Sequence, residues 1–220
     1  VVVDSVRRLS DDLEGALEAR TEAEQNLVWL ADHDPLTNLY NRRRFQEVFD
    51  RILGLSVRYH RSGALLFLDL DQFKYVNDAC GHPAGDRLIR KVADELMRSV
   101  RRDDIVARFG GDEFAILIRQ IDEEHAGRSG DTILANMRRM AHIEDEHVFH
   151  IHCSIGATML SEHNLVQDEL INQADVAGRE AKSAGRNRLA FYEPSEHTEQ
   201  RKNAEVSWMN SLRKAIDEDA

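Results

Sequence analysis

The sequence IVARFGGDEFAILIR, residues 105–119, contains two apolar stretches separated by Gly110-Gly111 and the acidic pair Asp112-Glu113. Short apolar runs with β-branched and aromatic residues are typical of buried strands, and paired glycines permit the tight turn of a β-hairpin. The stretch therefore predicts strands over 105–109 and 114–119, joined by a hairpin whose tip presents carboxylates.

Residues on either side of this hairpin alternate between helical and strand patterns. Apolar spacing predicts helices over 41–61, 85–100, 132–141 and 165–184, and apolar runs predict strands over 64–70, 147–158 and 188–192. Helices alternating with strands around a central hairpin indicate an α+β fold, with a sheet on one side and helices packed over it.

Residues 1–31 form a separate region. Apolar residues recur from Val2 to Leu30 at alternating spacings of four and three, with Arg20 on the same seam. This heptad pattern predicts a coiled-coil helix, in which a charged seam residue can set register or oligomeric state. The alternative is a helix that packs this stripe on its own domain, but the strict 3.5-residue period favours a partner helix.

Two prolines mark the domain boundaries. Pro35 disfavours helix in the residue before it, so we place a globular domain over 32–193. After Pro194 the composition becomes polar, and apolar residues at helical spacing resume at Val206. We therefore interpret 194–220 as a linker and a helix leading towards a further domain.

Composition restricts the class of protein. The 220 residues are 42% hydrophobic, as expected for one sizeable core with extensions, and the net charge of -11 argues against a broad nucleic-acid-binding surface. An anionic ligand would need a local basic pocket. Cys80 and Cys153 do not suggest a disulfide framework, which fits a reducing cytoplasm. No run reaches the ~18 apolar residues of a membrane span, although a longer parent protein could be anchored upstream.

Carboxylates cluster at the end of the apolar run 64–70. Asp69 and Asp71 are two residues apart, which places them on one face of a strand, and Lys74 follows. Magnesium is commonly held by one or two carboxylates together with substrate phosphates. A solvated strand end explains this piece equally well when it is taken alone, but together with Asp112 it predicts a metal site.

Further motifs occur in a fixed order around the hairpin. They are DPLTNLYNRR (34–43), DLDQFK (69–74), ND (77–78), GHPAGD (81–86), RFGGDEF (108–114), SIG (154–156) and AKSAGRN (181–187). From Asp32 to Tyr192 the chain resembles the GGDEF family of diguanylate cyclases. The resemblance implies a palm-like, mostly antiparallel sheet flanked by helices, similar to that of adenylyl cyclases. It also implies a cytoplasmic nucleotidyltransferase that joins two GTP molecules into cyclic di-GMP and releases two pyrophosphates.

The resemblance also implies roles for individual residues. Mg²⁺, or Mn²⁺, would be bound by Asp69, Asp112 and the Leu70 carbonyl, and the catalytic residues would be Asp112, Glu113 and Lys74, with either Asp112 or Glu113 helping to deprotonate the ribose 3′-hydroxyl. Asn77, His82 and Asp86 would recognise guanine, and Lys74, Lys182 and Arg186 would hold the phosphates. Arg101 and Asp104 resemble the family's inhibitory site for cyclic di-GMP. Since each GTP attacks the other, the enzyme would act as a homodimer.

Several features leave alternatives open. The family usually has Leu-Tyr where this chain has Ala177-Gly178, and a glycine inside a helix costs about 1 kcal/mol relative to alanine. The tail 210–219 resembles the approach to an EAL phosphodiesterase domain, so a GTP-binding module that regulates an adjacent phosphodiesterase is the main rival function. Without the family, Arg101 and Asp104 would be interpreted as a salt bridge. We interpret His147, His150 and His152 as solvent-facing strand residues rather than as a zinc site.

Overall fold

The computed structural model describes residues 15–17, 20–22, 24, 27, 29–59, 62–144, 146–160 and 166–194. The elements in chain order are β1 (Tyr40–Asn41), α2 (Arg42–Tyr59), β2 (Gly63–Leu70), α3 (Phe73–Cys80), α4 (His82–Ser99), β3 (Ile105–Gly110), β4 (Glu113–Arg119), α5 (Glu123–Arg139), β5 (Ala141–Glu144), β6 (His147–His150), β7 (Cys153–Leu160), α6 (Gln167–Ser183) and β8 (Leu189–Phe191).

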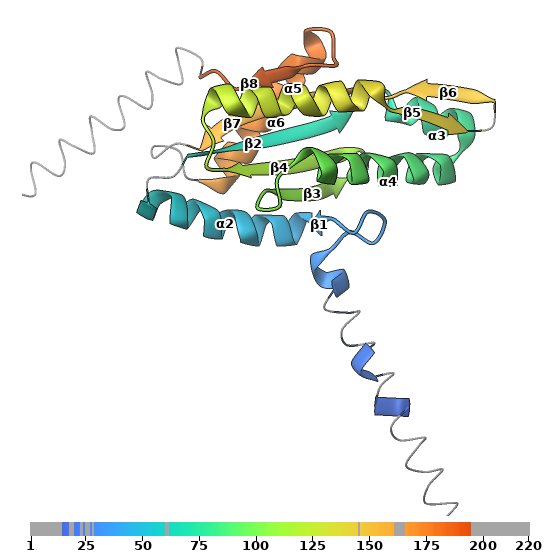
Figure 1. The fold of residues 1–220 in the computed structure, drawn as a ribbon, viewed down its shortest axis with the longest axis horizontal. Coiled ribbons are helices and arrows are strands. Elements are labelled where there is room, and N and C mark those ends of the chain that lie inside the picture. The colour runs from blue at the N-terminus through green and yellow to red at the C-terminus, as the bar shows by residue number, and fades with distance from the viewer. Residues whose placement is uncertain are drawn as a thin grey trace, which may run out of the picture.

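A six-stranded sheet in the order β1-β3-β4-β2-β7-β8 forms the centre of the domain, and β5 and β6 form a separate two-stranded sheet (Figure 1). The central pairs β3-β4, β4-β2 and β2-β7 are antiparallel, whereas the outer pairs β1-β3 and β7-β8 are parallel. This arrangement confirms the expected α+β fold with a mostly antiparallel, palm-like sheet.

Helices cover both faces of the sheet, which corrects the expectation that they would pack over one side. Leu66 of β2 belongs to a core that includes Leu88 of α4 and Ile133 of α5. Leu65, its neighbour, belongs to a second core with Phe45 of α2. Successive strand residues point to opposite faces, so a continuous apolar strand such as β2 must be covered on both sides.

Three elements differ from the sequence-based assignment. Helix α5 begins at Glu123 rather than near 132, because Asp122 caps it by accepting a hydrogen bond from the His125 backbone N–H at 2.9 Å. The strand expected over 147–158 is divided into β6 and β7, which belong to different sheets. Helix α3 was not predicted, since its eight residues are too few for a clear apolar period.

The chain enters the domain through a fixed junction. The described residues between 15 and 32 are helical, and the Trp29 and His33 rings stack at 4.8 Å. The Asn41 side chain donates to the Ala31 carbonyl at 2.8 Å, which satisfies a carbonyl at the end of this helix. The predicted coiled coil is only partly described, and its seam residues Leu27 and Leu30 are 67% and 48% exposed.

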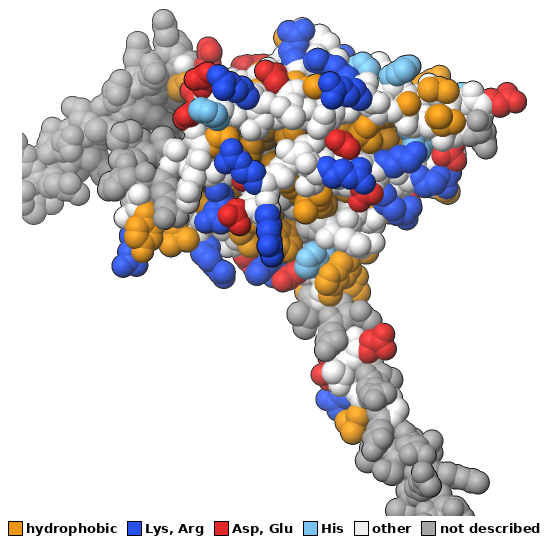
Figure 2. Space-filling view, viewed as in Figure 1, with side chains coloured by type: hydrophobic (Ala, Val, Ile, Leu, Met, Phe, Trp, Pro, Cys, Tyr) orange, Lys and Arg blue, Asp and Glu red, His pale blue; other side chains and the backbone are white. Residues whose placement is uncertain are grey.

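The predicted linker and helix beyond 194 lie outside the described residues. Among the helices that are described, none combines the length and apolar character needed to cross a membrane. Lys and Arg side chains are interspersed with Asp and Glu over the face drawn in Figure 2.

Candidate active site

The hairpin tip lies against the end of β2. Asp69 pairs with Glu113 in the β2-β4 register, and the Leu70 N–H donates to the Asp112 carbonyl at 3.2 Å. Gly111 turns the chain with a φ of 46°, in the left-handed region that glycine adopts without strain. The turn therefore brings the predicted metal-binding residues Asp69, Leu70 and Asp112 to one edge of the sheet.

The carboxylates at this edge repel one another. Burial, followed by the negative charge of Asp69, raises the pKa of Asp112. Burial raises the pKa of Glu113 as well, with further contributions from Asp69 and Asp112. A cation placed between Asp69 and Asp112 would relieve this repulsion.

The oxygen atoms of Asp69, Asp112 and the Leu70 carbonyl suit a hard cation whose remaining ligands are water or substrate oxygens. Within the described ranges, no group of three His, Cys, Asp or Glu side chains is arranged to hold a metal ion. Two carboxylates and a carbonyl leave positions for water and phosphate oxygens, which is how Mg²⁺ is usually held at nucleotide sites.

Lys182 reaches the same edge from the last turn of α6. Its Nζ lies 2.7 Å from Oδ2 of Asp69, and both side chains are partly exposed. The ammonium group thus balances one of the carboxylates and remains open to an incoming anion.

Helix α6 lies against the sheet at Gly156, where a side chain would not fit. A Cβ added to Gly156 of β7 would lie 2.0 Å from the Ala174 carbonyl oxygen and 2.1 Å from the Gly178 nitrogen. The backbones of strand and helix are therefore in direct contact, and α6 continues through Gly178 as far as Ser183. Gly178 does not interrupt the helix that carries Lys182.

Asp71 has a different position from the one expected for a metal ligand. Its side chain is only 5% exposed, and its carboxylate accepts hydrogen bonds from Ser154 Oγ at 2.8 Å and the Asn187 N–H at 3.0 Å. Arg186 Nε lies 4.0 Å from the same carboxylate. Asp71 therefore fixes the loop that presents Arg186, and only Asp69 of the two carboxylates faces Lys182.

The predicted guanine-binding residues lie on the α3-α4 helical hairpin. A Cβ added to Gly85 would lie 2.0 Å from Asn77 Oδ1, so the Asn77 side chain rests against α4 one residue before Asp86. His82 and Asp86 are exposed in the first turns of α4, and Lys74 is exposed on α3. The helical hairpin thus holds Asn77 next to Asp86.

Arg101 and Asp104 form a turn before β3. The Asp104 carboxylate accepts from the Arg101 N–H at 2.9 Å and the Arg119 N–H at 3.2 Å. The side-chain salt bridge considered as the alternative is not formed between these two described residues, and the Arg101 side chain is exposed.

Sequence reasoning assigned no role to Asp34 or Arg108. Arg108 NH1 donates to both carboxylate oxygens of Asp34, at 3.1 and 3.2 Å, and its Nε and NH2 donate to the Gly111 carbonyl at 3.2 and 2.8 Å. Both residues lie in the motifs quoted above, but only the fold places the two motifs together.

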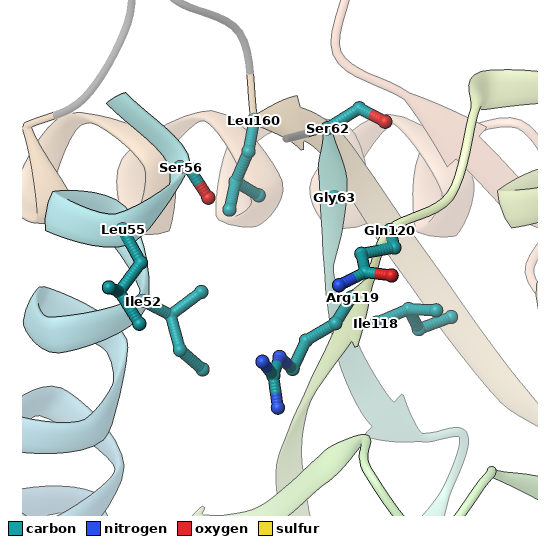
Figure 3. A pocket seen from close by; sticks show the side chains of 9 residues that line it. All are labelled: Ile52, Leu55, Ser56, Ser62, Gly63, Ile118, Arg119, Gln120 and Leu160. Atoms are coloured by element: carbon teal, nitrogen blue, oxygen red, sulfur yellow. The ribbon is translucent and has the colours of Figure 1, made fainter. Parts of the chain in front are cut away.

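A small pocket at the opposite edge of the sheet is separate from this site. It lies between α2 and the start of β2 with the end of β4, and Figure 3 shows Ile52, Leu55 and Ser56 on one side of it and Arg119 and Gln120 on the other. Its volume of about 20 Å³ is enough for about one water molecule.

The chain is similar to known proteins of one family. Residues 31–188 match the family model described as "Diguanylate cyclase, GGDEF domain". The chain is 35% identical over 183 residues to the probable diguanylate cyclase DgcE of Escherichia coli, covering 83% of the chain and 17% of the relative. It is 34% identical over 213 residues to MucR of Pseudomonas aeruginosa, a bifunctional diguanylate cyclase and cyclic di-GMP phosphodiesterase, covering 93% of the chain and 31% of the relative.

A solved structure shows the same fold. The coiled coil and GGDEF domain of DgcB from Caulobacter crescentus, solved in complex with c-di-GMP, superposes with a TM-score of 0.74 at 28% identity. The match covers 84% of this chain and 97% of that one. With the family model spanning residues 31–188, these matches show that the chain belongs to the GGDEF family of diguanylate cyclases.

Proposed function

We propose that this domain condenses two GTP molecules into cyclic di-GMP and releases two pyrophosphates. The observation that carries the proposal is that Asp69, Asp112 and Lys182 lie together at the end of β2 and the hairpin tip. Two carboxylates can bind a metal ion there, and the ammonium group can bind the triphosphate that the ion accompanies. The chain spans only 17% and 31% of the relatives DgcE and MucR, so this proposal concerns the domain and not a whole protein.

Asp69, Asp112 and the Leu70 carbonyl would hold Mg²⁺ or Mn²⁺. Burial and, after it, the negative charge of Asp69 raise the pKa of Asp112, and a divalent ion bound here would stabilise the ionised carboxylate against both. When bound, such an ion polarises the phosphate and neutralises charge at the reacting centre.

Glu113 is the better placed of the two candidate bases, since Asp112 would be occupied as a ligand. The ribose 3′-oxygen of one GTP forms a bond to the α-phosphorus of the other, the bond from that phosphorus to the bridging oxygen breaks, and pyrophosphate leaves with the electron pair. Glu113 would take the hydroxyl proton, and a carboxylate whose pKa is raised by burial is a stronger base for this step.

The remaining side chains would bind and orient the nucleotide. Asn77 and Asp86, with His82 nearby, would recognise guanine, because a carboxylate accepts from the N1 and N2 donors that adenine does not offer. Lys74, Lys182 and Arg186 would hold the phosphates, and Arg186 is supported by its position beside the buried Asp71.

The reaction needs two such sites facing each other, so we propose a homodimer. Leu27 and Leu30 are exposed in the single chain, which supports a partner helix along this seam. A paired N-terminal helix would raise the effective concentration of the two half-sites. The cytoplasm, where GTP is made and used, is the compartment that suits this activity.

Feedback by the product is also proposed. The exposed Arg101 side chain beside the turn fixed by Asp104 supports an inhibitory site for cyclic di-GMP, since a guanidinium pairs bidentately with phosphate or guanine.

The rival function is a GTP-binding module that regulates an adjacent phosphodiesterase. The description of MucR as bifunctional favours an EAL domain following this one. The unbroken helix through Gly178 favours activity, because Lys182 stays within 2.7 Å of Asp69.

Incubation of the purified chain with GTP and Mg²⁺ separates the two functions. Formation of cyclic di-GMP and pyrophosphate is expected. GTP binding without product, in a sample shown to be dimeric, would favour the regulatory module instead.

A further inference from the structure

The three histidines singled out in the sequence do not share one environment. His150 and His152 line a hollow of about 540 Å³ whose other walls include Gln72 and Arg186. His147, at the other end of β6, does not line it. His147 and His150 are exposed and His152 is half-buried, so the expected solvent-facing positions agree with the structure for His147 and His150, and His150 and His152 reach solvent through the hollow.

The hollow lies next to the end of β2 that carries Asp69, on the side away from the β3-β4 hairpin. The Asp71 N–H donates to the His152 carbonyl at 2.9 Å, which places His152 beside the residue that follows the end of β2. Asp69, two residues before Asp71, lies in β2 and is paired on the β4 side with Glu113 at the hairpin tip. A triphosphate with its α-phosphate at Asp69 and Asp112 could thus extend into the hollow.

The walls of the hollow suit an anion. Arg186 supplies a guanidinium, and the two imidazoles supply ring N–H donors. Among the described residues that line the hollow, Asp71 supplies the carboxylate, which accepts hydrogen bonds from Ser154 and the Asn187 N–H and lies 4.0 Å from Arg186 Nε. The two hydrogen bonds stabilise this carboxylate without using the imidazole groups, and the Arg186 side chain, which is 57% exposed, remains accessible to a ligand.

The backbone adds donors at the same place. Helix α3 starts directly after Gln72, which has a left-handed φ of 62°, so the first N–H groups of the helix begin at the rim of the hollow. The first N–H groups of a helix have no partner within it and favour negative charge.

We propose that His150 and His152, together with Arg186, hold the terminal phosphates of the nucleoside triphosphate and the pyrophosphate that leaves. This inference rests on the proposed function and adds two substrate-contacting residues to it. The two histidines would contribute to triphosphate affinity and to inhibition by pyrophosphate, and they would not contact the base or the ribose.

The experiment compares His150→Asn, His152→Asn and the double variant with a matched control, His147→Asn, which changes a histidine at the other end of β6, outside the hollow. Calorimetry measures the binding of GTP, GMP and inorganic pyrophosphate to each folded protein. The double variant should lose about tenfold in affinity for GTP and pyrophosphate, the change that one or two lost charge-assisted contacts produce. Its affinity for GMP, which lacks the terminal phosphates, should be unchanged, and the control should match the wild type throughout.

Two results would overturn the inference: unchanged pyrophosphate affinity in the double variant, or equal losses for GMP and GTP. A second pair, His150→Gln and His152→Gln, decides the matter if the asparagine variants fold poorly. Failure of the proposed function gives a different result: the wild type makes no cyclic di-GMP. The pyrophosphate affinities of the wild type and the double variant still test the role of the histidines in that case.

Discussion

The guanidinium of Arg108 joins the carboxylate of Asp34 to the carbonyl of Gly111. The side chains of Arg108 and Asp34 are 14% and 19% exposed, so this ion pair is mostly shielded from water. Asp34 also accepts from the Thr37 N–H and Oγ1, at 2.9 and 2.8 Å, and thereby fixes the turn that follows the N-terminal helix. One side chain therefore connects the entry of the chain to the turn that carries Asp112.

We expect Arg108→Lys to lower kcat by about tenfold with a smaller change in KM, because lysine cannot contact Asp34 and Gly111 at once and the hairpin loses its fixed position. Asp34→Asn should act in the same direction. Steady-state kinetics of both single variants and the double variant would show the double variant little worse than either one. Fully additive losses would mean that the two residues act separately.

Asp112→Asn should stabilise the domain without metal at neutral pH. The pKa of Asp112 is raised in the folded state, so its ionised form costs stability above that pKa, and the cost disappears as the pH falls through it. The gain in Tm should be no more than about 2–4 °C, which corresponds to about 1 kcal/mol in a chain of this size, because solvent screens the half-exposed site.

Thermal unfolding with and without Mg²⁺ measures this effect. Mg²⁺ should raise the Tm of the wild type and not that of Asp112→Asn, and the gain of the variant should vanish in acid. Asp131→Asn, an exposed change on α5, is the control. It should not raise the Tm without metal, and it should not abolish the stabilisation by Mg²⁺. Equal stabilisation of both proteins by Mg²⁺ would place the ion elsewhere.

The two glycines between α6 and β7 should respond in opposite ways to alanine. Gly156→Ala places a Cβ 2.0 Å from a backbone oxygen and should destabilise the domain by about 1–3 kcal/mol or more. A Cβ at Gly178 would meet Gly156 only at 3.7 Å, so Gly178→Ala should stabilise α6 by ~0.5–1 kcal/mol. Denaturant unfolding measures both changes, and destabilisation by Gly178→Ala would contradict the contact described.

Arg101→Ala should weaken the binding of cyclic di-GMP by about tenfold or more, since charge-assisted hydrogen bonds to phosphate or guanine are lost. Titration calorimetry with cyclic di-GMP measures the affinity, and the variant should also make product for longer before it slows. Arg102→Ala, the neighbouring exposed arginine, serves as the control. Equal affinities of Arg101→Ala and the wild type would leave this turn with a purely structural role.

The sequence predicted the hairpin and the edge of the sheet because both depend on local signals. Gly110-Gly111 sets the turn, and the apolar run of β2 ends at the carboxylates. The start of α5 was missed because its first turns are polar, and the cap at Asp122 outweighs the lack of apolar residues there.

Other features depend on contacts between distant segments. Asp71 bonds to residues 83 and 116 positions away, so spacing alone could not distinguish it from Asp69. The division of 147–158 into two strands placed His150 and His152 in a hollow with Arg186, which no local pattern indicates.

Product formation from GTP by the wild type and by Asp112→Ala tests the central claim most directly. With Mg²⁺ present, the wild type should convert GTP to cyclic di-GMP and pyrophosphate. The variant, with its fold and GTP binding confirmed, should lose about 10²-fold or more in rate, because a ligand to the ion that stabilises the reacting phosphate is removed. Turnover by Asp112→Ala at the wild-type rate would contradict the assignment of the hairpin edge as the active site.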